Sequence, residues 1–295
     1  MPQGPVTTGV MNDSLDDIRS SARTIREYGP VMGRLVDNTT LKTNIGLDWK
    51  EVFLNKLYAG NIEEMTDLEQ SPQEIVDGVF SIRPTAIGMS LFVTDRTKAR
   101  INSLVAAKMG VLVENAMSRK KDIDIIAIAQ TFTNDLGTAG QPMESGFIGA
   151  ATSRIANNAT EPWDGPTSTV LHGFQLKDIQ DELTASIGTY PVADGLTREV
   201  FLRGFSGMEV YGSKVWVDGN IPVDASDDAT GFTFASGAGG AIVFVQGMAS
   251  RMKTERKENI GTGAEILYTT DEYGLGLRQN AWGFTYTTDA SVPVN

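Results

Sequence analysis

The chain contains no cysteine among its 295 residues and only one histidine, His172. Without cysteine it can form neither a disulfide framework nor a thiolate zinc site. A metal site built on several histidines is excluded too, and a Ser/His/Asp triad would have to use His172 as its base. The stretch Gly165–Gly173 has no nucleophile-elbow spacing. We therefore expect His172 to be a helix-entry residue and not a catalytic base.

The chain also lacks an apolar run near the roughly 20 residues that a membrane-spanning helix needs. Its first residues, Met1–Pro5, have neither the basic nor the apolar region of a signal peptide. We therefore expect no membrane partner and no export by the usual secretory route. The net charge of −12 argues against tight binding to nucleic acid phosphates, so no sequence-specific binding of nucleic acid is expected.

What the chain does have is one long helical pattern, from about Asp95 to Thr131, without a proline. Roughly 36 residues at about 1.5 Å each would make a rod of about 54 Å, far longer than the usual globular helix of about 11–12 residues. Its expected apolar face repeats at three- and four-residue spacing: Ile101, Leu104, Val105, Met109, Leu112 and Ala116. The basic run Arg119–Lys121 is interpreted as a solvated patch in the last turn, complementing the helix dipole.

The rest of the chain, with 31 glycines, favours strands and turns. Further helices are expected over Ser14–Tyr28, Phe174–Ser186, Leu196–Leu202 and Gly247–Lys257. Strands are expected in Phe80–Val93, Met208–Val217, Gly240–Val245, Glu265–Arg278 and Trp282–Asp289. The stretch Leu41–Arg83 gives little evidence of its own core and is interpreted as an extended excursion. The glycine- and proline-rich stretch Asn134–Pro166 is predicted to be a long irregular loop, which makes it a candidate interaction surface.

No group of residues in the sequence indicates an active site. Asp122 and Asp124 with Asp135 could suggest a cation site, but residues two apart on a helix face different directions. The acids Asp224, Asp227 and Asp228 fit weak calcium binding no better than an ordinary solvated loop. We expect turns at Gly237–Gly240 and Gly261–Gly263, because neither has the lysine of a P-loop or the strand-to-helix context of a dinucleotide fingerprint. Asn158–Thr160 matches a glycosylation acceptor, which means little without secretion. We predict no catalytic residue, no cofactor-binding residue and no metal ligand.

Three groups of segments stand out when the chain is read in order. The first is Ser90–Ile101 followed by Met109–Lys121, a strand that leads into the long helix. The second is Phe205–Pro222, with a glycine turn, a strand and a "lysine-valine…proline" pattern. The third comprises the strand patterns in Ala241–Ser250, Tyr273–Arg278 and Thr287–Ala290. Together they resemble the major capsid proteins of tailed double-stranded DNA phages, which share the Hong Kong 97-like fold: the first looks like the strand that enters the family's spine helix, and the third is similar to its final strands.

The resemblance implies an α+β fold in four parts. These are an N-terminal arm (1–40), an extended E-loop (41–87), a peripheral domain with a spine helix at about 95–131 (88–165 and 272–295), and an axial domain (166–271). It implies a non-enzymatic protein that assembles, as hexamers and pentamers of itself, into an icosahedral shell around packaged double-stranded DNA. The expected location is the virion, after assembly in the host cytoplasm. Scaffolding, portal and cement proteins are the further partners that the family suggests, and 134–166 is a candidate docking surface for a cement protein.

Two family features are not expected here. Some members lose an N-terminal scaffolding segment to a protease; because this chain begins at Met1, we expect no such cleavage. Others form lysine–asparagine cross-links, for which Lys50 and Lys56 are placed in the predicted loop but no acceptor is evident. The alternatives are an encapsulin with the same subunit plan, or an acid-dependent hydrolase, which the absence of a convergent constellation disfavours. A tail or adhesion protein would need more repeated strands and no spine helix.

Overall fold

The computed structural model describes most of the chain, and two predicted helices fall largely or wholly outside it. The described residues are 26–42, 46–59, 61, 73–100, 103–185, 209–260 and 263–293, without the side chains of 103–108 and 183–185. The helix predicted at Leu196–Leu202 lies outside the described residues. So does most of the one predicted at Ser14–Tyr28, whose last residues, 26–28, are not helical.

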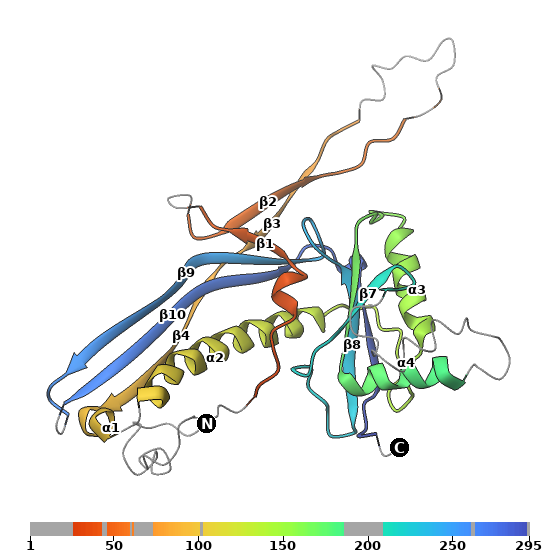
Figure 1. Ribbon diagram of the computed structural model, residues 1–295. Helices are drawn as coiled ribbons and strands as arrows, with labels where there is room; N and C mark the ends of the chain where they lie inside the picture. Colours follow the sequence, from red (N-terminus) through yellow and green to blue (C-terminus); the bar gives the residue numbers. More distant parts are fainter. Residues whose placement is uncertain are drawn as a thin grey trace.

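A four-stranded sheet with very long central strands forms one half of the molecule (Figure 1). Its order is β1 (Asp37–Thr40), β9 (Ile242–Lys257), β10 (Ala264–Leu277) and β4 (Thr85–Thr94). β9 and β10 form an antiparallel pair joined by a turn, β4 pairs antiparallel with β10, and β1 runs parallel to β9. Because β1 covers only residues 243–246 of β9, the outer half of β9 is an open edge within the described sheet.

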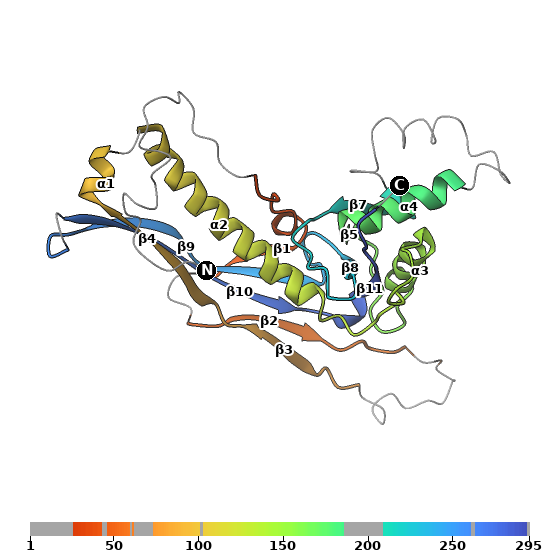
Figure 2. The ribbon, with the colours of Figure 1, turned by 90° about the horizontal axis from the view of Figure 1, so that it is seen from below.

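The long helix lies along this sheet, as Figures 1 and 2 show. It is shorter than predicted: α1 (Asp95–Arg100) is followed by α2 (Ser103–Ala129), with residues 101–102 outside the described structure. The buried face of α2 carries Val113, Met117, Asp122, Ile125, Ile126 and Ala129. Where side chains are described, from Met109 onward, the predicted stripe was wrong by one position, since Leu112 is 43% exposed whereas Val113 is buried. Its other members lie outside the described structure: Ile101 entirely, Leu104 and Val105 in their side chains. Apolar residues occur on several sides of α2, so their spacing alone did not identify the packed face.

A five-stranded sheet with two helices forms the other half (Figure 2). Its order is β11 (Gly283–Asp289), β8 (Asp228–Ala235), β5 (Thr167–Leu171), β7 (Ser213–Val217) and β6 (Glu209–Val210). The helices are α3 (Ser145–Ala156) and α4 (Gly173–Ala185). Every residue of the central strand β5 is buried, and Phe232, Phe234 and Tyr286 are among the largest fully buried side chains. The main core extends from this sheet to the C-terminal turns of α2.

Two sequence-based assignments are corrected. Gly247–Lys257 is not a helix but the outer half of β9, where pairing with β10 overrides the local preference. The predicted irregular loop Asn134–Pro166 contains α3, whose residues Ile148, Ala151 and Ile155 pack into the core at three- and four-residue spacing. The glycines and prolines around α3 concealed this short helical pattern.

The strand pairing also contradicts part of the predicted division into domains. β9 and residues 264–271 of β10, assigned to the axial domain, belong to the four-stranded sheet, where β9 pairs with β1 and β10 pairs with β4. Conversely, 283–289, assigned with the spine helix, pair with β8 in the five-stranded sheet. Strand partners far apart in the chain decide this membership, and sequence order does not reveal them. Two single-turn 3-10 helices, η2 (Met32–Arg34) and η5 (Asn280–Trp282), complete the described elements.

None of the helices that the structure describes is both long and apolar enough to cross a lipid bilayer.

Candidate functional site: an anchored apolar ribbon

The extended excursion predicted at Leu41–Arg83 contains a two-stranded ribbon that projects from the body of the molecule (Figure 1). β2 (Trp49–Leu54) and β3 (Asp77–Ile82) pair antiparallel, from Trp49 opposite Ile82 to Leu54 opposite Asp77. Side chains alternate between the two faces of a strand, so one ribbon face carries Trp49, Phe53 and Phe80 and the other carries Val52, Leu54 and Val79. The surroundings of the ribbon differ between its base and its far end.

At its base the ribbon packs on the four-stranded sheet. Ile82 is buried with Val243 and Val245 of β9, and Trp49 and Phe80 pack against the same cluster. The rings of Trp49 and Phe80 meet edge to face, with centroids 6.2 Å apart, a favoured geometry for aromatic pairs. The first part of the ribbon is therefore an integral part of the fold.

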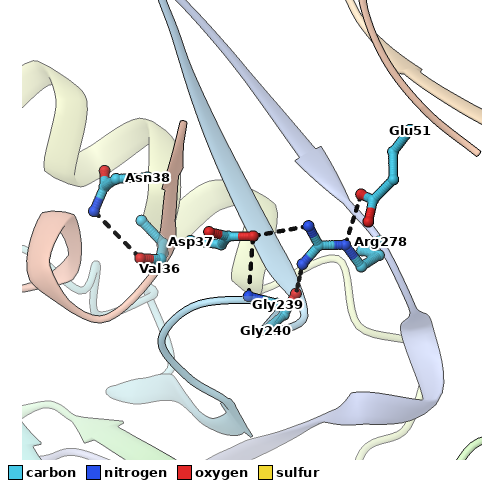
Figure 3. A network of polar contacts seen from close by, with 7 residues as sticks. All are labelled: Val36, Asp37, Asn38, Glu51, Gly239, Gly240 and Arg278. Atoms are coloured by element: carbon cyan, nitrogen blue, oxygen red, sulfur yellow. Dashed lines mark hydrogen bonds and ion pairs between the residues drawn. The ribbon is translucent and has the colours of Figure 1, made fainter. Parts of the chain in front are cut away.

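A polar network centred on Arg278, immediately after β10, also holds this base (Figure 3). Its Nε donates to Glu51 Oε2 on β2 at 2.8 Å, and its Nη2 donates to Asp37 Oδ2 on β1 at 2.8 Å. Its Nη1 donates to the carbonyl oxygen of Gly240 at 2.6 Å. Asp37 Oδ2 also accepts the backbone N–H of Gly239 at 3.1 Å. One guanidinium thus joins the ribbon, the strand that follows the arm and the loop before β9.

The charge state of Arg278 is secured by its partners. Its side chain is only 15% exposed, and burial by itself would lower its pKa. The hydrogen bonds with Asp37 and Glu51 outweigh that effect and raise the pKa of Arg278 above its ordinary value. Removing Arg278 would leave the carboxylates of Asp37 and Glu51 without their cation, so the guanidinium is the member of the network on which the connection depends.

Beyond the base, the ribbon exposes apolar side chains. Val52 and Val79 face each other across the strands, and the ring of Phe53 lies over Gly78. Each of the large apolar residues on this part of the ribbon is more than half exposed: Val52, Phe53, Leu54, Leu57, Tyr58, Ile75, Val76 and Val79. Single exposed apolar residues are ordinary, but a contiguous group of this kind usually marks an interaction surface.

The ribbon also touches the body near its far end. Lys56 Nζ donates to the carbonyl oxygen of Ala159, in the loop after α3, at 3.3 Å. Lys50, on β2, is exposed. The ribbon is therefore braced against both halves of the molecule but leaves its apolar residues uncovered.

The acidic residues singled out from the sequence are not brought together. Asp122 accepts the backbone N–H groups of Val31 and Met32 at 2.9 and 2.8 Å. Asp124 Oδ2 accepts the hydroxyl of Tyr273 at 2.6 Å, and Asp135 Oδ1 accepts the backbone N–H of Gly137 at 3.0 Å. Each side chain thus holds a different piece of backbone or sheet.

The group Asp224, Asp227 and Asp228 forms a tight turn. Asp224 Oδ1 accepts the backbone N–H groups of Ser226 at 2.8 Å and Asp228 at 2.9 Å, and Asp227 has a left-handed φ of 62°. These contacts are typical of an Asx-type turn. Among the residues that the structure describes, no three His, Cys, Asp or Glu side chains are grouped so as to hold a metal ion.

His172 lies directly before α4, as expected for a helix-entry residue. Its Nδ1 accepts the backbone N–H of Phe174 at 3.4 Å, and the two rings meet edge to face. Burial lowers the pKa of His172, which favours the neutral imidazole that such an acceptor requires.

The glycine-rich segment Gly237–Gly240 is the turn that the sequence predicts, with Gly237 and Gly239 at φ of 85° and 76°. Gly261 lies outside the described residues, and Gly263 closes the turn into β10 by donating to the carbonyl oxygen of Ile260 at 2.9 Å. Asn158 Oδ1 accepts the backbone N–H of Thr160 at 2.9 Å.

The basic run on α2 was misinterpreted as a solvated patch in the last turn. The helix continues to Ala129, and all three residues of the run are paired. Arg119 pairs with Glu27 at 3.0 Å, Lys120 with Asp124 at 2.5 Å and Lys121 with Asp271 at 2.5 Å. The run therefore connects the arm and β10 to the helix.

Sequence analysis missed the anchoring residues Asp37, Glu51 and Arg278. Arg278 was noted only as the end of a strand pattern, and the two acids are widely separated from it in the chain. No local motif connects them, so only the sheet pairing could have identified the network.

Comparison with known proteins gives a consistent result at the level of structure. No protein-family model matches the chain. No curated protein matches it by sequence. Among solved structures, the capsid of cyanophage P-SCSP1u is similar at a TM-score of 0.69 and 12% identity, over 97% of this chain and 96% of that one.

Two other solved structures are similar over nearly their whole length. The acid-stable capsid of Helicobacter pylori bacteriophage KHP30 matches at a TM-score of 0.71 and 13% identity, over 98% of this chain and 100% of that chain. The SrpI encapsulin complex of Synechococcus elongatus PCC 7942 matches at 0.66 and 11% identity, over 99% of both. The chain therefore has the Hong Kong 97-like fold.

Proposed function

We propose that this chain is the major capsid protein of a tailed phage, and that its copies assemble into an icosahedral shell around packaged double-stranded DNA. The observation that carries the proposal is the fold match, which extends over nearly the whole chain on both sides for phage capsids. The exposed apolar ribbon supports it independently, because the described body leaves these residues uncovered and packing on another molecule would stabilise them. In a closed shell, a second copy of the chain supplies that molecule through symmetry.

In this proposal the parts of the chain have the following roles. The β2–β3 ribbon within 41–87 is the E-loop, and residues up to 40 are the arm. The four-stranded sheet with α2 is the peripheral domain, and the five-stranded sheet with α3 and α4 is the axial domain. These assignments keep the predicted four parts but follow the strand pairing, so β9 belongs with the spine helix and β11 with the axial domain.

The acidic composition is compatible with this role. A net charge of −12 would let DNA pack inside the shell without adhering to its wall, since like charges repel over about 8–10 Å at physiological ionic strength. The role requires no catalysis, and we infer a structural protein. A strongly basic inner surface in the assembled particle would contradict the argument about the wall.

An encapsulin is the second candidate, supported by the similarity to the Synechococcus elongatus complex. Both candidates predict a closed shell, so assembly alone does not separate them. The content of particles purified from the native source does: packaged DNA supports the phage capsid, whereas a co-purifying enzyme inside the shell supports the encapsulin.

Expression of the full chain alone, followed by size-exclusion chromatography and negative-stain electron microscopy, tests assembly. Closed particles, tubes or rings of five and six subunits are expected. If only a monomer or dimer forms, the experiment is repeated with co-expressed candidate scaffolding proteins. A chain that stays monomeric in every combination would contradict the proposal.

A further inference from the structure

Two buried carboxyl groups meet where the arm, α2 and the five-stranded sheet join. Asp122 lies on α2 and Asp218 directly follows β7, and each is only 1% exposed. Asp122 Oδ1 accepts the backbone N–H groups of Val31 and Met32, at 2.9 and 2.8 Å. These two amides stand at the entry to η2, so Asp122 holds the end of the arm against the helix.

Asn220 connects the two acids. Its side-chain Nδ2 donates to Asp122 Oδ2 at 3.0 Å, and its backbone N–H donates to Asp218 Oδ1 at 2.9 Å. The backbone N–H of Asp218 in turn donates to the carbonyl oxygen of Leu171, at the end of β5, at 3.0 Å. Through Asn220 and Asp218, the carboxylate that holds the arm is joined to the centre of the five-stranded sheet.

One oxygen of this pair is left without a donor. Asp218 Oδ2 is buried and accepts no hydrogen bond from the residues that the structure describes. A buried ionised oxygen without a donor is costly, but a protonated Oδ2 would itself become a donor. Burial, followed by the side-chain hydrogen bond with Asp122, raises the pKa of Asp218 to about 7. A proton on Asp218 therefore removes the cost of its donorless oxygen and the repulsion from the neighbouring Asp122 carboxylate.

The charged groups around the pair are engaged elsewhere. On α2, Arg119 pairs with Glu27, Lys121 with Asp271, and Asp124 with Lys120. On the arm, Arg34 lies over the ring of Trp216, and the ring of Tyr28 covers Gly219. His172, next to Leu171, hydrogen-bonds Phe174. Within the described part of the chain, no cation pairs with Asp122 or Asp218, so a proton is the available counter-charge.

We propose that Asp218 holds a proton on its buried Oδ2, donates it in a hydrogen bond to Asp122, and thereby forms a pH-dependent lock that joins the arm and α2 to the five-stranded sheet. With the proton on Asp218 Oδ2, that group donates to Asp122 and the junction is closed. When the proton leaves to water, two buried carboxylates repel each other and the junction loosens. The lock is a property of the single chain, so it does not depend on the shell that the chain is proposed to form.

The direction of the effect follows from linkage. The folded chain holds a proton on Asp218 at pH values where the unfolded chain has already lost it, because the folded pKa lies above the ordinary 3.8. The stabilising effect of that proton is fully present below about pH 4 and is lost as the pH rises to about 7. Raising the pH from 5 to 8 is therefore expected to lower the folding equilibrium constant on the order of a hundredfold through the loss of this proton.

The substitution Asp218→Asn tests the lock in the full-length protein. Asparagine keeps a donor for Asp122 and has no charge to lose, so the variant should be more stable than the wild type at pH 8 and about equally stable at pH 5. Urea unfolding gives the free energy of unfolding of both proteins at both pH values. The difference between variant and wild type at each pH cancels the contribution of all other titrating groups. The matched control is Asp164→Asn, an exposed acid, which should retain the wild-type dependence on pH.

Amide hydrogen exchange supplies a local measurement. In the wild type, protection of the Val31 and Met32 amides, corrected for intrinsic rates, should fall between pH 5 and pH 8, whereas in Asp218→Asn it should stay constant. Equal dependence on pH in variant and wild type would overturn the proposal. If the variant does not fold, the carboxyl carbon of Asp218 is titrated by NMR in the wild type, where a midpoint below about pH 5 would equally overturn it.

Discussion

The five-stranded sheet and the β2–β3 ribbon use apolar residues in opposite ways. In the sheet, every residue of β5 is buried, and Phe232, Phe234 and Tyr286 lie within the core. In the ribbon, Val52 and Val79 form an equally regular cross-strand pair, yet both are more than half exposed. Similar strand patterns therefore serve two purposes: one set of apolar side chains stabilises the chain itself, and the other is available for a second molecule.

Arg278 lies where the exposed ribbon leaves the packed body of the molecule. Its bonds to Asp37 and Glu51 fix the direction of the ribbon without covering its apolar end. A ribbon with a rigid base presents its apolar residues in one geometry, which reduces the ordering that binding would otherwise require.

The largest loss of stability is expected from the core of the five-stranded sheet. Phe232→Ala removes a fully buried ring from β8 and leaves a cavity, so it should lower the free energy of unfolding by about 3–5 kcal/mol. Urea unfolding of the variant and the wild type measures this difference. A loss below about 1 kcal/mol would mean that this region does not form the packed core described above.

The next effect is expected at the base of the ribbon. Arg278→Met keeps much of the side-chain length but leaves Asp37 and Glu51 without their cation, and should cost about 3 kcal/mol of unfolding free energy. The control is Arg83→Met, which removes the same charge from an exposed pair with Asp48 at 3.8 Å and should cost under about 1 kcal/mol. Equal losses in the two variants would show that the network does not anchor the ribbon.

A substitution on the exposed part of the ribbon should leave the stability of the chain nearly unchanged but should prevent assembly. Val79→Asp places a charge on an exposed face, so the unfolding free energy should change by no more than about 0.5 kcal/mol. Assembly should nevertheless be lost, because burying that charge at an interface is costly. Electron microscopy and size-exclusion chromatography of the variant measure assembly. Val292→Asp introduces the same change at a residue of comparable exposure and should still assemble; normal particles from both variants would exclude the ribbon as an interface.

The smallest effect is expected from an exposed ion pair outside both regions. Lys98 on α1 and Glu265 on β10 approach within 2.5 Å, but their side chains are 58% and 40% exposed. Lys98→Met should change the unfolding free energy by about 0–1 kcal/mol. Unfolding at low and high salt checks this, and a larger loss would mean that α1 depends on the pair for its position.

Much of this fold could be predicted from local patterns. The long helix, the strand before it, the strand at Glu265–Arg278 and the extended excursion were all expected, because each has a period or composition that neighbouring residues reveal. The helix predicted at Gly247–Lys257 was wrong since its partner strand, β10, decides its conformation. Helix α3 was missed because its short apolar pattern lies among glycines and prolines.

The candidate site, too, could be predicted only in part from the sequence. The excursion and its lack of a core could be recognised from composition, whereas the Arg278 network and the Asp122–Asp218 pair could not. Each of those groups joins residues from distant parts of the chain, and none has a local motif. Asp122 was considered only as a metal ligand, although its role in the structure is to hold two backbone amides of the arm.

The sequence alone determined the features that short-range forces control: the helical period of α2, the turn at Gly237–Gly240, the helix entry at His172 and the acidic balance of the whole chain. The tertiary structure decided which face of α2 is buried, which sheet each strand joins and where the buried charges meet. Those outcomes depend on contacts between residues tens to hundreds of positions apart, and the energy of such a contact depends on its partner as much as on the residue itself.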